Sequence, residues 1–247
     1  MTGLLVLLRH GQSAGDTAGR FAGLRDVPLT ASGAAEASRA GARLARAGIA
    51  PDLVLTSTLQ RATHTAELVT DALGRDVPTH ALWRLNERDH GALTGRRQDD
   101  VRRELGDDRV DALRGSLDAR PPRMPVGSWV ALWASPALRG LPMAAITRAE
   151  SLGDVVHRVR PVLDDRIAPE LRRGRTVLVV GHGDSLRALA LCIDHLTEPE
   201  LARLELPAAQ PVLHRLDADG RPFPRGGAHL DPASQGVADA LTTDGAA

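Results

Sequence analysis

The sequence predicts a three-layer α/β/α sandwich with a mainly parallel sheet. Short apolar runs at residues 4–8 and 176–180 each stop at a glycine-containing turn, which is typical of strands buried on both faces of a parallel sheet. Strand-like and helix-like patterns then alternate along the chain, and this alternation favours helices on both faces of the sheet. With 247 residues, 43% of them apolar, the chain can bury the core of one such domain, which we expect over residues 1–217.

The remaining elements follow in chain order. The stretches "LTASGAAEASRAGARLARAG" and "STLQRATHTAELVTDALG" have the spacing of amphipathic helices and each closes at a glycine, with a third candidate strand between them at residues 52–56. Residues 150–173 predict a long helix that Pro161 and Pro169 should kink or divide. The stretch "DSLRALALCIDHL" predicts a helix after the 176–180 strand, and "QPVLHRL" predicts a late edge strand.

Two segments depart from this rhythm. Residues 115–148 contain five prolines and two of the three tryptophans, so we expect an insertion that covers a cleft. Residues 218–247 are rich in Gly, Pro, Asp and Ala without apolar periodicity, which predicts a mobile C-terminal tail.

Composition excludes several function classes. The formal net charge is zero and all 31 basic residues are arginine, which argues against general binding of nucleic acid or of a membrane surface. Cys192 is the only cysteine, so neither an intrachain disulfide nor a thiolate metal cluster can form. The N-terminal apolar run is too short for a membrane helix and lacks the features of a signal peptide, so we expect a soluble, cytoplasmic protein.

Histidines follow both of the principal predicted strands. Ligands of open parallel sheets bind beyond the carboxyl ends of the strands, where this chain places Arg9-His10-Gly11 and Gly181-His182-Gly183. Neutral imidazole is a nucleophile that can accept a phosphoryl group and pass it on. Arg9 could then bind phosphate oxygens in a bidentate manner, and Gly11 could let the backbone approach them.

Two further residues fit a phosphoryl-transfer site. Arg61 lies in the first turn of a predicted helix, where the helix dipole disfavours a cation by about 0.3–1 kcal/mol. A bound phosphate would explain this placement, whereas a solvated surface arginine is the plain alternative. Glu87, between apolar positions and a glycine turn, could protonate a leaving alkoxide or deprotonate an incoming hydroxyl.

Taken together, these stretches resemble the histidine phosphatase superfamily, and most closely its cofactor-dependent phosphoglycerate mutase branch. The resemblance runs from about residue 4 to residue 216, through "LLRHGQS", "FAGLRDVPLTASG", "TSTLQRATHTA", "WRLNERDHGALTG", "ESL", "IAPELRRGRTVLVVGHGDSLRAL" and "LPAAQPVLHRLD". It implies a phosphorylated nucleophile at His10, a general acid/base at Glu87, and a phosphate pocket of Arg9, Arg61 and His182.

The same resemblance implies a substrate, a cofactor and partners. The activity would be interconversion of 2- and 3-phosphoglycerate in glycolysis, with 2,3-bisphosphoglycerate as the phosphoryl donor that primes His10 and with no metal. Related mutases are often homodimers or homotetramers, and no nucleic-acid or membrane partner is implied. The expected substrate-binding residues are Gly11, Asp16, Ala22, Gly23, Arg88, His90, Gln98, Arg114, Gly183 and Asp184.

Several of these positions depart from the mutase pattern. Mutases of this branch usually have Asn where this chain has Asp16, Thr where it has Ala22, Tyr where it has His90, Lys where it has Gln98, and Asn where it has Asp184. They usually have a paired arginine where this chain has Arg114-Gly115. Four of these changes each remove one positive or add one negative charge, at Asp16, Gln98, Gly115 and Asp184. We therefore expect an intact phosphoryl-transfer core with weakened selectivity for strongly anionic phosphoglycerates, unless Arg96 and Arg97 compensate.

Other interpretations of the sequence remain open. A phosphomonoesterase acting on a less anionic metabolite is the main alternative to a mutase, and the two differ in whether water or a substrate hydroxyl accepts the phosphoryl group. A binding module that keeps the fold without the chemistry is a second alternative. The string "GDSL" at residues 183–186 also occurs in serine esterases, but here it lies late in the chain, and Ser185 is better explained as opening a helix. Nine histidines without a close metal-binding spacing do not favour zinc.

Overall fold

A six-stranded sheet forms the centre of the computed structural model, which describes residues 3–216 and 222–230. The strand order is β3-β2-β4-β1-β5-β6, as predicted mainly parallel. Strands β1, β2, β3 and β4 pair in parallel, whereas β5 and β6 add to one edge in antiparallel pairs. Their bounds are β1 Leu4–Arg9, β2 Leu53–Thr56, β3 Thr79–Ala81, β4 Thr176–Gly181, β5 Val212–Leu216 and β6 Pro222–His229.

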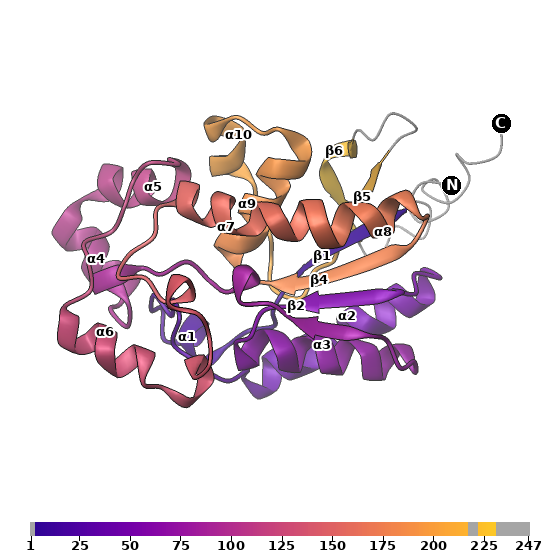
Figure 1. The fold of residues 1–247 in the computed structure, drawn as a ribbon, viewed down its shortest axis with the longest axis horizontal. Helices are drawn as coiled ribbons and strands as arrows, with labels where there is room; N and C mark the ends of the chain where they lie inside the picture. The colour runs from indigo at the N-terminus through magenta and orange to yellow at the C-terminus, as the bar shows by residue number, and fades with distance from the viewer. Residues whose placement is uncertain (1–2, 217–221, 231–247) are drawn as a thin grey trace.

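Helices cover both faces of this sheet (Figure 1). On one side lie α2 (Ala31–Arg46) and α3 (Gln60–Leu73); on the other lie α7 (Leu152–Val162), α8 (Ala168–Arg172), α9 (Gly183–Asp194) and α10 (Glu198–Arg203). The alternation of β1 explains the three layers, because Leu5 and Leu7 belong to one core cluster while Val6 and Leu8 belong to the other. A continuous apolar run therefore fills two cores at once, as expected for a strand buried on both faces.

The predicted helix over residues 150–173 is divided, as its prolines suggest. Pro161 lies inside α7, a π-helical turn η5 (Leu163–Ile167) follows, and Pro169 sits in the first turn of α8. Proline cannot donate the backbone hydrogen bond of a regular helix, and its ring clashes with the preceding turn. The chain stays helical through the π-helical turn η5 into α8, which ends shortly before β4.

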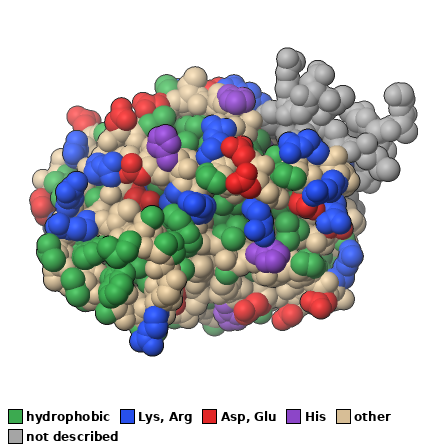
Figure 2. Space-filling view, viewed as in Figure 1, with side chains coloured by type: hydrophobic (Ala, Val, Ile, Leu, Met, Phe, Trp, Pro, Cys, Tyr) green, Lys and Arg blue, Asp and Glu red, His purple; other side chains and the backbone are tan. Residues whose placement is uncertain are grey.

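The carboxyl edge of the sheet faces a group of short helices at one end of the molecule (Figure 1). These are α1 (Ala14–Thr17), α4 (Gln98–Leu105), α5 (Asp107–Gly115) and α6 (Val126–Trp133), with single turns η1 (Trp83–Leu85), η2 (Gly91–Leu93), η3 (Pro136–Leu138) and η4 (Met143–Ala145). The expected insertion over residues 115–148 packs here in a small core in which its Leu138 and Ile146 join Leu24 and Leu59 from outside the insertion. Apolar side chains of α6 gather on the surface over this end (Figure 2), where Val126 and Trp133 are exposed.

Two expectations about the C-terminal part are wrong. The stretch at residues 210–216 supplies the predicted strand, β5, but not at the edge of the sheet, because β6 pairs with β5 and takes the outer position. Regular structure therefore extends beyond residue 217, and residues 222–229 are not a tail. Leu230 follows β6, and the remaining expected tail residues, 218–221 and 231–247, lie outside the described part of the chain. Within residues 3–216 and 222–230, no helix has the length and apolar content needed to cross a membrane.

Candidate active site

His10 and His182 meet because β1 and β4 are neighbours in register. Arg9 pairs with Gly181 at the carboxyl ends of these strands, and the His10 backbone N–H donates to the Gly181 carbonyl across 3.1 Å. The two imidazole rings lie with centroids 5.0 Å apart at an interplanar angle of 61°. The two histidines thus lie together at this edge of the sheet, where ligands of parallel sheets bind.

The surroundings of His10 leave one ring nitrogen available as a nucleophile. Nδ1 lies 2.8 Å from the Gly11 carbonyl oxygen, which can only accept, so Nδ1 carries the proton of the neutral ring. Nε2 then carries the lone pair and accepts from Arg61 Nε across 3.3 Å. Burial, together with the charge of Arg61, lowers the pKa of His10 to about 3, so the ring is neutral at physiological pH.

Arg61 points into the site and not into solvent. It lies in the first turn of α3 and is 1% exposed. Its guanidinium group donates to the carbonyls of Gly23 and Arg25, at 2.9 and 2.8 Å, as well as to His10. These bonds fix a buried cation beside the nucleophile, where it can neutralise a phosphoryl oxygen.

The His182 ring contacts Ser57 through Nε2, and it also lies next to the His10 ring. Ser57, which directly follows β2, places its hydroxyl 2.7 Å from His182 Nε2 while accepting from the Leu59 backbone N–H. The Ser57 hydroxyl can donate its proton to Nε2, and in that tautomer of His182 the ring proton lies on Nδ1. Nδ1 is buried and has no hydrogen-bond partner among the described residues. Burial, assisted by Arg61, lowers the pKa of His182, so the ring is a neutral donor suited to a phosphoryl oxygen.

Arg9 and Asp16 form an ion pair at the pocket wall. Arg9 Nη2 lies 3.0 Å from Asp16 Oδ1, and both side chains are one-third exposed. The other Asp16 oxygen accepts from the backbone N–H of Ser13, which caps α1 in a reciprocal capping box. Asp16 thus takes part in the N-terminal cap of α1 and also forms an ion pair with Arg9.

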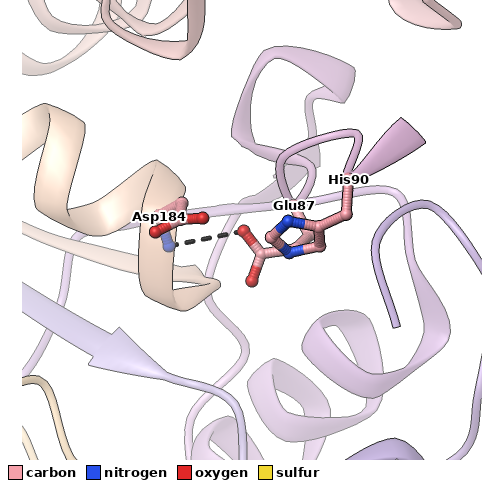
Figure 3. Close-up of side chains that lie close together, drawn as sticks. All are labelled: Glu87, His90 and Asp184. Carbon is pink, nitrogen blue, oxygen red and sulfur yellow. Dashed lines mark hydrogen bonds between the residues drawn. The ribbon is translucent and has the colours of Figure 1, made fainter. Parts of the chain in front are cut away.

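Glu87 lies across the pocket from these groups, in the loop after η1. Its Oε1 accepts from the backbone N–H groups of Arg88 (2.8 Å) and Asp184 (3.3 Å), the second of which is drawn in Figure 3. Burial, reinforced by the Asp184 carboxylate, raises the pKa of Glu87. A raised pKa keeps the carboxyl group protonated to higher pH than a free glutamic acid, which suits the predicted acid/base role.

Asp184 is held between two arginines. Its Oδ2 lies 2.8 Å from Arg88 Nε, and its Oδ1 accepts from Arg187 Nη1 at 3.2 Å. Burial alone would raise the pKa of Asp184, but Arg88, His90 and Arg187 together lower it below its usual value. The Asp184 side chain is 13% exposed, and the two arginines are still more buried.

Glu87, His90 and Asp184 are also the described residues closest to a metal-binding arrangement. Each can offer one ligand atom, and these atoms lie within 4.8 Å of one another (Figure 3). Both Asp184 oxygens already contact guanidinium groups. Burial and the neighbouring Arg88 charge lower the pKa of His90 to about 3, so positive charge on this imidazole ring is disfavoured. These surroundings do not favour a divalent cation.

The site opens into a cavity of about 400 Å³. Thirteen of the fifteen predicted site residues line it: Arg9, His10, Asp16, Ala22, Gly23, Arg61, Glu87, Arg88, His90, Gln98, Arg114, Gly183 and Asp184. His182, which is fully buried against the His10 ring, is not among the lining residues. From the expected insertion, only Pro121 is among the lining residues.

Two sequence interpretations need correction. Gly11 does not line the cavity; its N–H donates to Thr65 Oγ1, and a Cβ at this position would lie 2.2 Å from the Gly33 carbonyl oxygen. The glycine is therefore needed for backbone packing. Arg96 and Arg97 do not compensate the lost charge, because they lie outside the cavity in ion pairs with Glu104 and Asp99.

Sequence reasoning missed several residues that hold the site. Ser57 could have been found from its position directly after β2, at the edge where ligands bind. Arg187 follows Asp184 by three residues on α9, a spacing at which opposite charges meet on one helix face. Arg158 ion-pairs with Glu150 and donates to the Glu87 carbonyl, a contact between distant segments that gives no local signal.

The arrangement of a neutral histidine nucleophile, a second histidine, buried arginines and one protonatable carboxyl is suited to phosphoryl transfer by side chains alone. The sequence profile of the histidine phosphatase superfamily (branch 1) matches residues 5–223, so the chain belongs to this superfamily.

Curated relatives match over nearly the whole chain. A 2,3-bisphosphoglycerate-dependent phosphoglycerate mutase of Bifidobacterium longum is 43% identical over 94% of both chains. The protein of the same name from Thermobifida fusca is 41% identical over 98% of both. Among solved structures, a mycobacterial glucosyl-3-phosphoglycerate phosphatase in complex with VO3 is 25% identical, with a TM-score of 0.66 over 89% of this chain and 96% of that one. The chain is thus similar to mutases in sequence and to a phosphatase in fold.

Proposed function

We propose that the protein transfers phosphoryl groups through a phosphohistidine at His10, and that its reaction is the 2,3-bisphosphoglycerate-dependent interconversion of 2- and 3-phosphoglycerate. The position of His10 Nε2 carries this proposal, because this unprotonated nitrogen lies beside the buried Arg61 guanidinium and next to His182. The mutases that share 40–43% of their residues with this chain support the choice of substrate.

The groups at the site supply each step of the transfer. His10 Nε2 attacks the phosphorus of a bound phosphate ester, the bond from phosphorus to the ester oxygen breaks, and Glu87 gives its proton to the leaving oxygen. In the second half-reaction the Glu87 carboxylate takes the proton of an incoming hydroxyl, which attacks the phosphorus and frees His10. Arg61 and Arg9 neutralise the phosphoryl oxygens, and His182 Nδ1 donates to one of them.

The test supplies purified protein with 3-phosphoglycerate, with and without 2,3-bisphosphoglycerate, and measures both 2-phosphoglycerate and free phosphate. We expect 2-phosphoglycerate to form and its rate to rise with the bisphosphate. The His10→Ala variant should lose activity and the acid-labile phosphate label, and full activity in this variant would refute the nucleophile. A wild-type protein that takes up no label from any phosphorylated donor would favour the binding module.

A phosphomonoesterase acting on a less anionic metabolite is the second candidate. The contacts of Asp184 with Arg88 and Arg187, and of Asp16 with Arg9, favour it, because each occupies a cation that could otherwise bind an anionic substrate. Release of free phosphate in excess of 2-phosphoglycerate, with no effect of the bisphosphate, would identify this reaction.

The setting of the reaction is part of the same proposal. A mutase of this kind would serve glycolysis in the cytoplasm, act without a metal, and assemble as a homodimer or homotetramer. Unchanged activity in excess chelator tests the second of these statements, and light scattering of the purified protein tests the third.

A further inference from the structure

We infer that Asp184 acts as an internal anion beside two arginines, which weakens the binding of a substrate carboxylate and so raises the relative preference of the site for phosphate esters whose remaining part is uncharged. The inference rests on the proposed phosphoryl transfer at His10 and concerns how the same site selects its substrate. Its basis is the position of one carboxylate between two arginines at the cavity wall.

Asp184 covers one side of both guanidinium groups, so a ligand cannot approach the two arginines from that side. Arg88 Nε contacts Asp184, and its Nη1 donates to the Leu113 carbonyl at 2.7 Å. Arg187 Nη1 is shared between Asp184 and the Arg114 carbonyl, and its Nη2 donates to the Leu201 carbonyl at 2.7 Å. A ligand carboxylate would have to displace Asp184 in order to contact both guanidinium groups.

Displacement is unfavourable because both arginines are buried and the Asp184 side chain is only 13% exposed. Arg88 and Arg187 are 5% and 6% exposed, so water screens their attraction for Asp184 only weakly. A second carboxylate brought into the same place would also meet the charge of Asp184 itself. Like charges brought together at a desolvated contact are strongly disfavoured, and proteins use them to reject unwanted ligands.

One part of the cavity wall suits an uncharged group, although Arg20, Asp99, Arg102, Asp111 and Arg114 also line the cavity. Besides Pro121, six of its lining side chains are apolar and larger than alanine, and they come from four different elements or loops: Phe21, Leu93, Val110, Leu113, Leu204 and Leu206. The His90 ring packs against Phe21 with centroids 5.0 Å apart and is neutral, so it extends this surface. A hydroxylated or apolar group can lie here once the phosphate is held by Arg9 and Arg61.

The test compares two phosphate esters that differ in one carboxylate. Dissociation constants of 3-phosphoglycerate and glycerol 3-phosphate are measured calorimetrically in the His10→Ala background, which does not turn the ligands over. Exchange of Asp184 for Asn keeps a hydrogen-bond acceptor and removes the charge. We expect this exchange to raise the preference for 3-phosphoglycerate over glycerol 3-phosphate at least about tenfold.

The chain offers a matched control and a second variant. Asp100 also pairs with an arginine three residues later, Arg103, in the first turn of a helix, but it lies outside the cavity. The Asp100→Asn variant should keep the original preference, and so should Asp184→Glu, which retains the charge. Asp184→Ala, which also removes the charge, should raise the preference for 3-phosphoglycerate as Asp184→Asn does.

An unchanged preference in Asp184→Asn, or an equal rise in Asp100→Asn, would overturn the inference. So would an unchanged preference in Asp184→Ala, and this second variant keeps the inference testable even if Asp184→Asn does not fold. Because the measurement is of binding, it remains decisive if the wild-type protein forms no phosphohistidine, an outcome that would defeat the proposed function alone.

Discussion

Arg61 Nε donates to His10 Nε2 across 3.3 Å, and this contact joins the first turn of α3 to the carboxyl end of β1. The arginine therefore acts on the nitrogen that we propose to carry the phosphoryl group. Its Nη1 and Nη2 donate to the carbonyls of Arg25 and Gly23, so the guanidinium plane cannot rotate away from His10. A cation held in this way needs little rearrangement when charge develops on the phosphoryl group.

Exchange of Arg61 for Lys should show the value of this fixed plane. Lysine keeps the charge but presents a single point of contact, so it cannot bond both carbonyls and the phosphoryl group together. We expect kcat/KM to fall about 10²–10³-fold, the usual effect of losing one donor at a developing charge. Arg46→Lys, exposed on α2, is the matched control and should not change the rate. A wild-type rate for Arg61→Lys would show that charge alone suffices.

Exchange of Glu87 for Gln should remove a proton donor while keeping an acceptor for the Arg88 N–H. We expect kcat with an alkyl phosphate to fall about 10²–10⁴-fold, the usual contribution of a general acid. With p-nitrophenyl phosphate the loss should be much smaller, because nitrophenolate leaves without a proton. An equal loss with both substrates would mean that Glu87 is not the acid. Glu67→Gln, exposed on α3, serves as the control.

The pH profile of the same pair tests the raised pKa of Glu87. A raised pKa keeps the carboxyl protonated to higher pH, so the rate with an alkyl phosphate should decline as pH rises through that pKa. The Glu87→Gln variant has no such group and should lack this decline. A decline of the same size in the variant would assign it to another residue.

Buried neutral histidines should make the fold sensitive to acid. The pKa of His90 is lowered from 6.5 to about 3 by burial and by Arg88, so between these values the unfolded chain binds the proton that the folded chain rejects. The contribution of His90 to stability is therefore complete above about pH 6.5 and falls as pH drops toward 3. The free energy of unfolding should therefore rise with pH in this range. His90→Gln should reduce the slope of that free energy against pH, measured by urea unfolding, by up to about 1.4 kcal/mol per pH unit. His64→Gln, exposed on α3, should leave the slope unchanged, and equal slopes in all three proteins would contradict this assignment.

Much of the site could be predicted because neighbouring strand ends coincide. The positions of His10 and His182 follow from the glycine turns that end two apolar runs, and Arg61 was indicated by a cation placed against a helix dipole. Ser57 and Arg158 act across the fold, so no local spacing reveals them. The strand β6 was missed because "PFPRGGAH" carries two prolines and two glycines, which weaken a strand pattern. Its antiparallel pairing with β5 overrides that composition.

Arg158 should act as a positioning residue for Glu87. It lies on α7, pairs with Glu150 at 2.8 Å, and donates to the carbonyls of Arg84 and Glu87 at 2.6 and 3.1 Å. Glu150 in turn accepts from the Asp89 N–H at 2.9 Å, so the pair holds the loop on both sides of Glu87.

Exchange of Arg158 for Gln would leave the Glu150 carboxylate buried without its cation. We expect a loss of about 3 kcal/mol of stability, as for one partner removed from a buried ion pair. At a temperature where the variant is folded, kcat with an alkyl phosphate should fall while KM changes little, and the decline of rate at high pH should shift because the Glu87 loop is displaced. Arg160→Gln, exposed on the same helix, is the matched control. If Arg158→Gln loses stability but keeps both kcat and the pH profile, the residue supports the fold without positioning Glu87.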